Sequence, residues 1–142
     1  MLLTNNKGEK VMEKFKTSRG LFLYIILSAI TFGIYPLYYM HRVSYELNVT
    51  CAEDGKHTRG LIGVFLLSLI TFGIYSIIWW YCAANRMEQY GYRNKAYGIT
   101  INGIKYLLWN TFGTLLFGLG PLIAMYKFIH SHNIVNLSYN NK

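Results

Sequence analysis

The stretch that decides the fold runs from Arg59 to Trp80 and reads RGLIGVFLLSLITFGIYSIIWW. It has an earlier counterpart at Arg19–Tyr39, which reads RGLFLYIILSAITFGIYPLYY. Eleven of the seventeen positions in Arg19–Tyr35 are identical to those in Arg59–Tyr75, at an offset of forty residues. Self-similarity at a fixed period indicates an internal repeat. We therefore expect the chain to consist of copies of one helical unit.

A third, degenerate copy follows these two. Thr31-Phe32-Gly33 recurs as Thr71-Phe72-Gly73 and, after another forty residues, as Thr111-Phe112-Gly113. Phe117-Gly118 could equally be the counterpart of the Phe-Gly step, so the register of the third copy stays open. In each copy an uncharged arm leads to Thr-Phe-Gly, and a second arm leads to a polar exit. In the first two copies tyrosine and tryptophan cluster before that exit, as in an aromatic belt at a membrane interface.

The repeats also predict the domain organisation. The length of 142 residues is that of one domain. We expect a membrane domain at residues 19–136, with repeats at about 19–58, 59–98 and 99–136. A polar, basic N-terminal tail at residues 1–18 precedes this domain, and a polar C-terminal tail at residues 137–142 follows it.

Charge is separated from apolar sequence along the chain. Hydrophobic residues make up 53% of the chain and charged residues only 14%, whereas a soluble domain carries roughly a quarter charged residues. No Asp, Glu, Lys or Arg occurs in Gly20–Met40, Gly60–Asn85 or Tyr106–Tyr126. This pattern excludes a disordered protein and argues strongly against a soluble enzyme. It indicates a small multi-pass membrane protein, with no cofactor and no catalytic residues.

Two geometries fit the charge-free runs. The one we favour is an all-α protein with three kinked transmembrane segments, since twenty-one helical residues measure about 31 Å, close to the hydrocarbon core. Gly33 and Gly73 would then permit a kink or a close helix contact. The alternative is three membrane-embedded helical hairpins, which would place all fourteen Lys and Arg residues on one side. In either geometry Gly118-Leu119-Gly120-Pro121 breaks the third run, with Pro121 in the first turn of its second piece.

The expected partners follow from the same pattern. The lipid bilayer is the first, and Lys10, Lys14, Lys16 and Arg19 predict an interaction of the N-terminal segment with anionic lipids. Self-association or contact with other membrane proteins would occur through the helices. Nucleic acid is not expected, because the basic residues are scattered while the aromatic residues lie in the apolar runs.

Polar residues inside the apolar runs are few. They include Ser28, Thr31, Ser68, Thr71, Asn110 and Thr111. We interpret them as packing contacts, with Asn110 requiring a partner on another helix. The absence of charge within the runs argues against a pump or a coupled transporter.

One loop gathers groups capable of chemistry. Cys51, Glu53, Asp54 and His57 lie within seven residues, so they could bind a metal ion or act in acid–base catalysis. Their spacing matches no standard ligand set, and we interpret them as a solvated loop and expect no metal. His130 and His132, which follow the third run, are interpreted as interfacial residues.

Leu66–Trp80 and its partner Leu27–Tyr39 resemble the signature of domain-of-unknown-function family 4234, which comprises small bacterial integral membrane proteins. The loop Cys51–Lys56, the triplet Asn85-Arg86-Met87 and the late Gly118–Pro121 resemble the same family. The resemblance implies a location in the bacterial inner or cytoplasmic membrane, with several passes, and no particular activity. We therefore expect a non-enzymatic accessory or interaction protein that acts through helix contacts or membrane shape. The alternative is a small oligomeric channel or pore.

Overall fold

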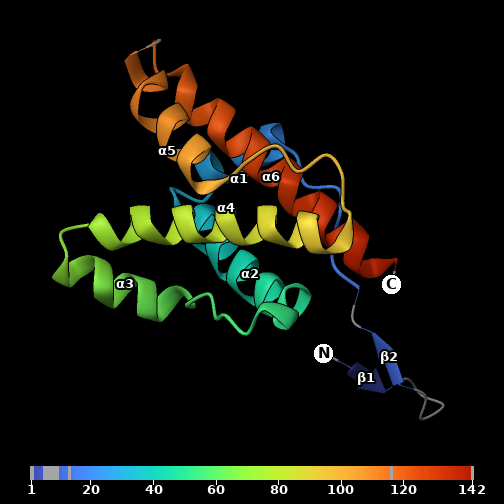
Figure 1. The fold of residues 1–142 in the computed structure, drawn as a ribbon. Coiled ribbons are helices and arrows are strands. Elements are labelled where there is room, and N and C mark those ends of the chain that lie inside the picture. The colour runs from blue at the N-terminus through green and yellow to red at the C-terminus, as the bar shows by residue number, and fades with distance from the viewer. Residues whose placement is uncertain (1, 5–9, 13, 116, 142) are drawn as a thin grey trace.

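Three helical hairpins, one in each predicted repeat, make up the fold (Figure 1). The computed structural model describes residues 2–4, 10–12, 14–115 and 117–141. Within those ranges the α-helices are α1 (Leu21–Ile30), α2 (Ile34–Thr50), α3 (Leu61–Ile70), α4 (Ile74–Asn94), α5 (Gly103–Thr111) and α6 (Leu119–Asn140). Two short 3-10 helices, η1 (Ala52–Asp54) and η2 (Gly113–Leu115), and an antiparallel pair of strands, β1 (Leu2–Thr4) and β2 (Lys10–Met12), accompany them.

Each charge-free run is divided between two helices that fold back on each other. The ring of Tyr24 in α1 lies 5.7 Å from that of Tyr35 and 5.6 Å from that of Tyr39, both in α2. In the second hairpin the indole Nε1 of Trp79 donates a hydrogen bond of 2.9 Å to the carbonyl of Arg59, just before α3. The expectation of three kinked segments is therefore wrong for these helices, which form three hairpins as in the alternative, while their embedding in a membrane stays a prediction.

The helices also differ from membrane spans in length. None of the described helices is both long enough and apolar enough to cross a bilayer. The apolar helices α1 and α3 have ten residues each, which is about 15 Å, half of a hydrocarbon core of about 30 Å.

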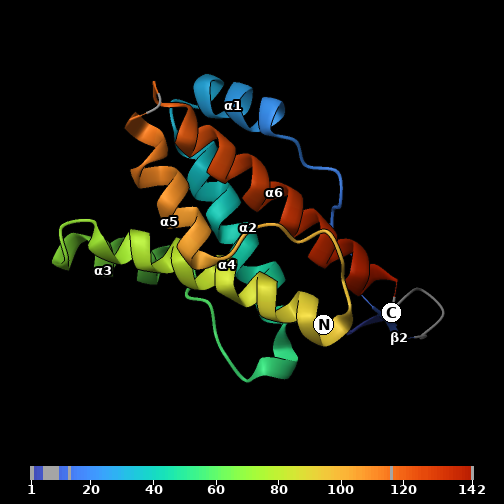
Figure 2. The same ribbon diagram turned by 45° about the horizontal axis from the view of Figure 1, so that its top comes forward.

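The long helix of each hairpin supplies the core. Helices α2, α4 and α6 contact one another, and α1, α3 and α5 pack outside them (Figure 2). The fully buried large side chains come mainly from the long helices, with Tyr39, Val43, Leu47, Met87, Tyr90, Phe128 and Val135 among them. In contrast, α1 has no buried residue and α3 has only Val64.

The predicted tails pack in part against the helices. Phe15 is buried, and its ring stacks on that of Tyr139 at 5.6 Å. Helix α6 continues through the predicted boundary at residue 136 and ends at Asn140. The segment before α1 therefore lies along α6 and forms one end of the molecule, and the three hairpin turns lie on the side away from the termini (Figures 1 and 2).

Candidate functional site

The first hairpin turn is an unusual helix ending. The amide of Phe32 donates to the carbonyl of Ala29 at 3.3 Å, and that of Gly33 donates to the carbonyl of Ser28 at 2.8 Å. This pair of bonds is a Schellman motif, in which the left-handed residue is usually glycine. Here that residue is Phe32, with φ of 53°, and Gly33 follows with φ of 88°. A left-handed backbone costs an L-residue about 1–2 kcal/mol.

The second turn repeats this geometry, and the third repeats its two left-handed residues, with the Gly118 amide donating instead to the carbonyl of Thr114 at 3.1 Å. Phe72 has φ of 54° and Gly73 has φ of 88°, and the Gly73 amide donates to Ser68 at 2.7 Å. In the third hairpin, Phe117 has φ of 55° and Gly118 has φ of 75°. Phe117-Gly118 is thus the third counterpart. The equal offset that favoured Thr111-Phe112-Gly113 is misleading, because α5 ends there and Phe112 keeps a right-handed backbone.

The threonine and the glycine of the first two turns have structural roles. The hydroxyl of Thr31 donates to the carbonyl of Leu27 at 2.6 Å and accepts from the amide of Tyr35 at 2.9 Å. Thr71 makes the matching bonds at 2.7 and 3.0 Å. A side chain on Gly33 or Gly73 would meet open space, so each glycine is required by its positive φ.

The phenylalanines have no such role. Phe32 and Phe72 are 97% exposed, and Phe117 is 100% exposed. Each ring extends from a strained backbone into the surroundings at the far end of a hairpin. Backbone strain that is not offset by local packing is typical of functional positions. We define these three residues as the tip phenylalanines.

In the third hairpin, glycines allow the two helices to approach closely near the turn. A side chain on Gly120 would clash with the backbone of Gly113 and with the carbonyl of Trp109, so α5 and α6 approach closely there. Gly118 caps α6 with its positive φ, and Pro121 lies in the first turn of that helix. The side-chain amide of Asn110 donates a hydrogen bond of 2.9 Å to the carbonyl of Tyr106 in its own helix. Asn110 was expected to bond to another helix, and this bond lies within α5 instead.

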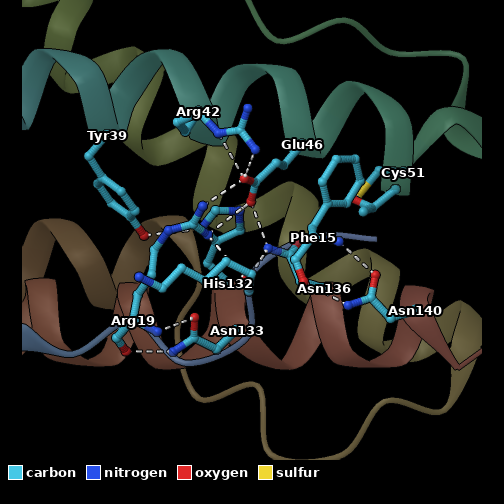
Figure 3. Close-up of polar contacts among 12 residues, drawn as sticks. Phe15, Arg19, Tyr39, Arg42, Glu46, Cys51, His132, Asn133, Asn136 and Asn140 are labelled. Atoms are coloured by element: carbon cyan, nitrogen blue, oxygen red, sulfur yellow. Dashed lines mark hydrogen bonds and ion pairs between the residues drawn. The ribbon is translucent and has the colours of Figure 1, made fainter. Parts of the chain in front are cut away.

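A buried ion cluster holds the opposite end together (Figure 3). The carboxylate of Glu46 in α2 is fully buried and accepts from both terminal nitrogens of Arg19, at 2.7 and 3.0 Å. Arg42, one turn earlier, donates to the same carboxylate at 2.9 Å. Nε2 of His132 in α6 lies 2.9 Å from Glu46 Oε2. The interfacial position expected for His132 is wrong, since its side chain is fully buried.

The cluster shifts the pKa values of its members. Burial favours a raised pKa for Glu46, but the contacts from His132 and Arg19 outweigh it and hold the pKa well below its usual range. Burial lowers the pKa of His132, and the carboxylate opposes this only in part. The imidazole is therefore neutral near pH 7, with the hydroxyl of Tyr39 3.1 Å from its Nδ1. A neutral ring with its proton on Nε2 suits both neighbours.

A row of asparagines on α6 binds the segment before α1. Asn133 and Asn140 each pair with both the amide and the carbonyl of one residue, Arg19 and Phe15 respectively, at 2.7–3.2 Å. Asn136 donates to the carbonyl of Lys16 at 3.0 Å and to Glu46 Oε2 at 2.6 Å. Sequence reasoning missed this row, although the spacing of three and four residues places all three on one helix face.

A second cluster of polar contacts holds the loop that carries the candidate residues Cys51 to His57. Arg86 in α4 is buried and donates to both carboxylate oxygens of Asp54, at 2.7 and 2.9 Å. It also bonds to Asn48, Thr58 and the carbonyls of Cys51 and Lys56. Burial favours a raised pKa for Asp54, but the ion pair with Arg86 outweighs it and lowers the pKa. Arg86 thus contacts this loop at several points, and Asn48 and Ser44 of α2 also bond to the backbone of Thr58.

The four candidate loop residues are placed differently from one another. Cys51 is buried at the end of α2, and burial raises the pKa of its thiol. Asp54 is committed to Arg86, whereas Glu53 and His57 are exposed. In the described part of the chain, no three His, Cys, Asp or Glu residues lie close enough to hold a metal ion.

The two clusters occupy equivalent places in the repeat. We call the glycines that follow the tip phenylalanines, Gly33, Gly73 and Gly118, the tip glycines. Thirteen residues after each tip glycine lies a buried residue, namely Glu46, Arg86 or Ser131. Glu46 binds Arg19, which precedes α1, and Ser131 accepts from the amide of Thr100, which precedes α5. Arg86 bonds to Thr58, which precedes α3. A buried polar residue thus fastens the entry to a short helix in each copy, a regularity visible only once Gly118 is taken as the third tip glycine.

These features define an all-helical protein of three repeated hairpins, apolar at the turns and polar at the other end. The chain belongs to the family described as a domain of unknown function (DUF4234), which matches residues 19–66 and, separately, residues 59–131. No curated protein and no solved structure matches the chain.

Proposed function

We propose that this is a non-enzymatic protein of the bacterial cell membrane whose three hairpins dip into one leaflet of the bilayer. The polar end, with its buried ion clusters, would remain at the surface. There the protein would act as an accessory or interaction protein, through helix contacts and through its effect on membrane shape. The observation that carries the proposal is the geometry of the tip phenylalanines, which are strained and almost wholly exposed.

The exposed apolar surface supports insertion. Helix α1 reads LFLYIILSAI and buries none of its residues, and α3 reads LIGVFLLSLI and buries one. Exposed apolar surface on this scale marks a membrane or partner contact. The hydroxyl of Ser28 is bonded to the carbonyl of Tyr24 at 2.6 Å, so α1 presents little unsatisfied polarity to lipid.

The dimensions support one leaflet. A ten-residue helix of about 15 Å reaches about halfway through a hydrocarbon core of about 30 Å. A turn inside lipid must satisfy its own polar groups. The turns after α1 and α3 meet that requirement with their Schellman-type bonds and with the hydroxyls of Thr31 and Thr71.

The channel alternative lacks an equivalent observation. Four of the polar groups that could line a pore are bonded within their own helix or turn, namely those of Ser28, Thr31, Thr71 and Asn110, whereas the buried hydroxyl of Ser68 has no hydrogen-bond partner within the described ranges. We therefore propose the accessory role.

Replacement of Phe32, Phe72 and Phe117 by asparagine tests the proposal. Asparagine adopts the left-handed backbone more readily than phenylalanine, so the fold should keep or gain stability. Membrane affinity should fall by at least about tenfold for each ring removed, since burial of a phenylalanine contributes about 1.5–3 kcal/mol. Flotation of the purified protein with phosphatidylcholine vesicles measures affinity, and melting in detergent measures stability.

A matched control replaces Tyr92 and Tyr97, which are exposed aromatic residues far from the tips, by asparagine. This variant should float like the wild type. Unchanged flotation of the tip variant would show that the tip phenylalanines do not serve insertion, and a loss of stability in detergent would contradict the strain assigned to their backbone.

A further inference from the structure

A pocket of about 540 Å³ lies between the loop that precedes α3 and the side of α4. Lys56, His57 and Arg59 line it from the loop, and all three are exposed. Among the described residues that line the pocket there is no aspartate or glutamate. The nearby carboxylate of Asp54 is bound by the guanidinium of Arg86. The pocket therefore has an excess of positive charge at its rim.

The part of the other wall nearest the hairpin turn is apolar and aromatic. Tyr75, Ile78 and Trp79 of α4 line it. Ile78 is 47% exposed and continues into the apolar face that carries Ile74 and ends at Phe72. The pocket thus lies at the border between the polar end and the apolar hairpin, with cations on one side and apolar surface on the other.

The pocket is held open by contacts already in place. Arg86 bonds to the carbonyl of Lys56 and to the hydroxyl of Thr58, at 2.7 and 2.9 Å. The indole of Trp79 donates to the carbonyl of Arg59 at 2.9 Å. These bonds use the backbone of Lys56 and Arg59 and fix the loop against α4. Ligand sites are usually preformed in this way.

We propose that this pocket binds the phosphate-bearing headgroup of an anionic phospholipid. The ammonium group of Lys56 and the guanidinium of Arg59 supply charged donors, which form short, strong hydrogen bonds with phosphate oxygens. The acyl chains would lie along Ile78 and Ile74. The inference rests on the proposed insertion of the hairpins, because insertion brings this border to the level of the headgroups. The site is distinct from the basic N-terminal segment.

Cys82 provides a reporter for the test. Its side chain lines the pocket and is exposed, while Cys51 is buried. The rate at which a maleimide labels Cys82 is measured on the full chain in detergent micelles. Dioleoylphosphatidylglycerol, dioleoylphosphatidylcholine and inorganic phosphate are added separately. We expect the phosphatidylglycerol to slow labelling, and the other two to leave the rate unchanged.

A double variant, Lys56→Gln with Arg59→Gln, should need about thirtyfold more phosphatidylglycerol for the same protection, as expected when two basic groups are lost from an anion-binding site. Lys95→Gln with Lys105→Gln removes the same charge outside this pocket and should behave like the wild type. Equal losses in the two variants would overturn the site in favour of general surface charge. Equal protection by phosphatidylcholine, or by inorganic phosphate, would overturn the assignment to an anionic lipid.

Flotation with phosphatidylcholine vesicles separates this site from the insertion itself. If the wild type floats but phosphatidylglycerol gives no protection in micelles, the pocket assignment fails and the proposed function stands. If protection occurs in micelles but the protein does not float, insertion fails instead, and the inferred use of the pocket at a bilayer fails with it.

Discussion

The guanidinium of Arg19 donates two parallel hydrogen bonds, of 2.7 and 3.0 Å, to the carboxylate of Glu46. The arginine precedes the first short helix, and the glutamate lies in the polar half of the first long helix. Their side chains are 11% and 0% exposed, so the pair is largely removed from water. Removing one member of such a pair leaves an uncompensated buried charge.

Glu46→Gln should therefore destabilise the protein by about 3–5 kcal/mol. The matched control is Arg42→Gln, since the side chain of Arg42 contacts the same carboxylate but is 30% exposed. Its loss should cost about 1 kcal/mol or less, as for an exposed ion pair. Chemical denaturation in detergent measures both. Similar losses for the two variants would mean that burial does not set the strength of this cluster.

Acidification should destabilise the fold through the same cluster. Burial lowers the pKa of His132 below its ordinary value of 6.5. Below pH 6.5 the histidine is therefore protonated in the unfolded chain but stays neutral in the folded chain, and this difference favours unfolding. The pKa of Glu46 is also lowered from its ordinary value of 4.5, so its stabilising contribution is present above that pH and is lost as the pH falls toward its folded pKa. The melting temperature should fall between about pH 7.5 and pH 5.5, with a further fall at lower pH.

His132→Gln should remove the upper part of this dependence and keep the lower part. The comparison uses the slope of melting temperature against pH, because the substitution also changes stability at every pH. Carboxyl groups titrate mainly below about pH 5.5, so the slope above that pH reports on histidine. If the wild type and His132→Gln had the same slope of melting temperature against pH above about pH 5.5, the assignment to His132 would be contradicted.

The tip glycines should respond to backbone strain and not to side-chain size. Gly73 has φ of 88° and open space where a side chain would lie. Gly73→Ala and Gly73→Leu should each lower the free energy of unfolding by about 1 kcal/mol or more, and Gly73→Asn should lower it by less. Melting in detergent gives the order. A loss that grows from alanine to leucine would indicate packing instead.

Gly120 provides the contrast. Its backbone φ is not positive, but a side chain there would clash with the backbone of Gly113 and Trp109. Gly120→Ala should therefore cost more than Gly73→Ala, because two helices must separate to accommodate it. Equal melting temperatures for the two variants would show that the α5–α6 approach tolerates a methyl group.

Arg86 should control access to Cys51. The thiol is fully buried under the loop that Arg86 ties to α4, and the arginine donates to the carbonyl of Cys51. In a Cys82→Ser background, Arg86→Gln should raise the rate of maleimide labelling several-fold, because the loop opens more often. Arg93→Gln is the control, since Arg93 lies 4.0 Å from Asp54 and is 34% exposed. Unchanged labelling in Arg86→Gln would mean that other contacts hold the loop.

Local features of the chain were predictable from sequence. The repeat, the charge-free arms and the Thr-Phe-Gly steps are read directly, and a glycine with positive φ depends only on its own backbone. The family resemblance through Leu66–Trp80 is confirmed by the match to residues 19–66 and 59–131. The membrane location inferred from the same runs stays a prediction.

The choice between kinked spans and hairpins needed the structure. A glycine in an apolar run permits a helix kink, a close helix contact or a chain reversal, and twenty-one apolar residues fit the length of a span. Phe32 decided the matter by taking a left-handed backbone, which ends α1 after ten residues. Nothing in its side chain favours that conformation, so propensity could not reveal it.

The sequence by itself thus determined where the chain is apolar, where it repeats and where it can turn, because these depend on neighbouring residues. Tertiary structure decided that Phe117-Gly118 forms the third tip, since the glycine contact between Gly113 and Gly120 places the turn there. It also decided the polar clusters: Arg19 meets Glu46 across 27 residues, and Asn136 meets Glu46 across 90. Partners so far apart share no local pattern, and only the packing of the first hairpin against the third brings them into one buried site.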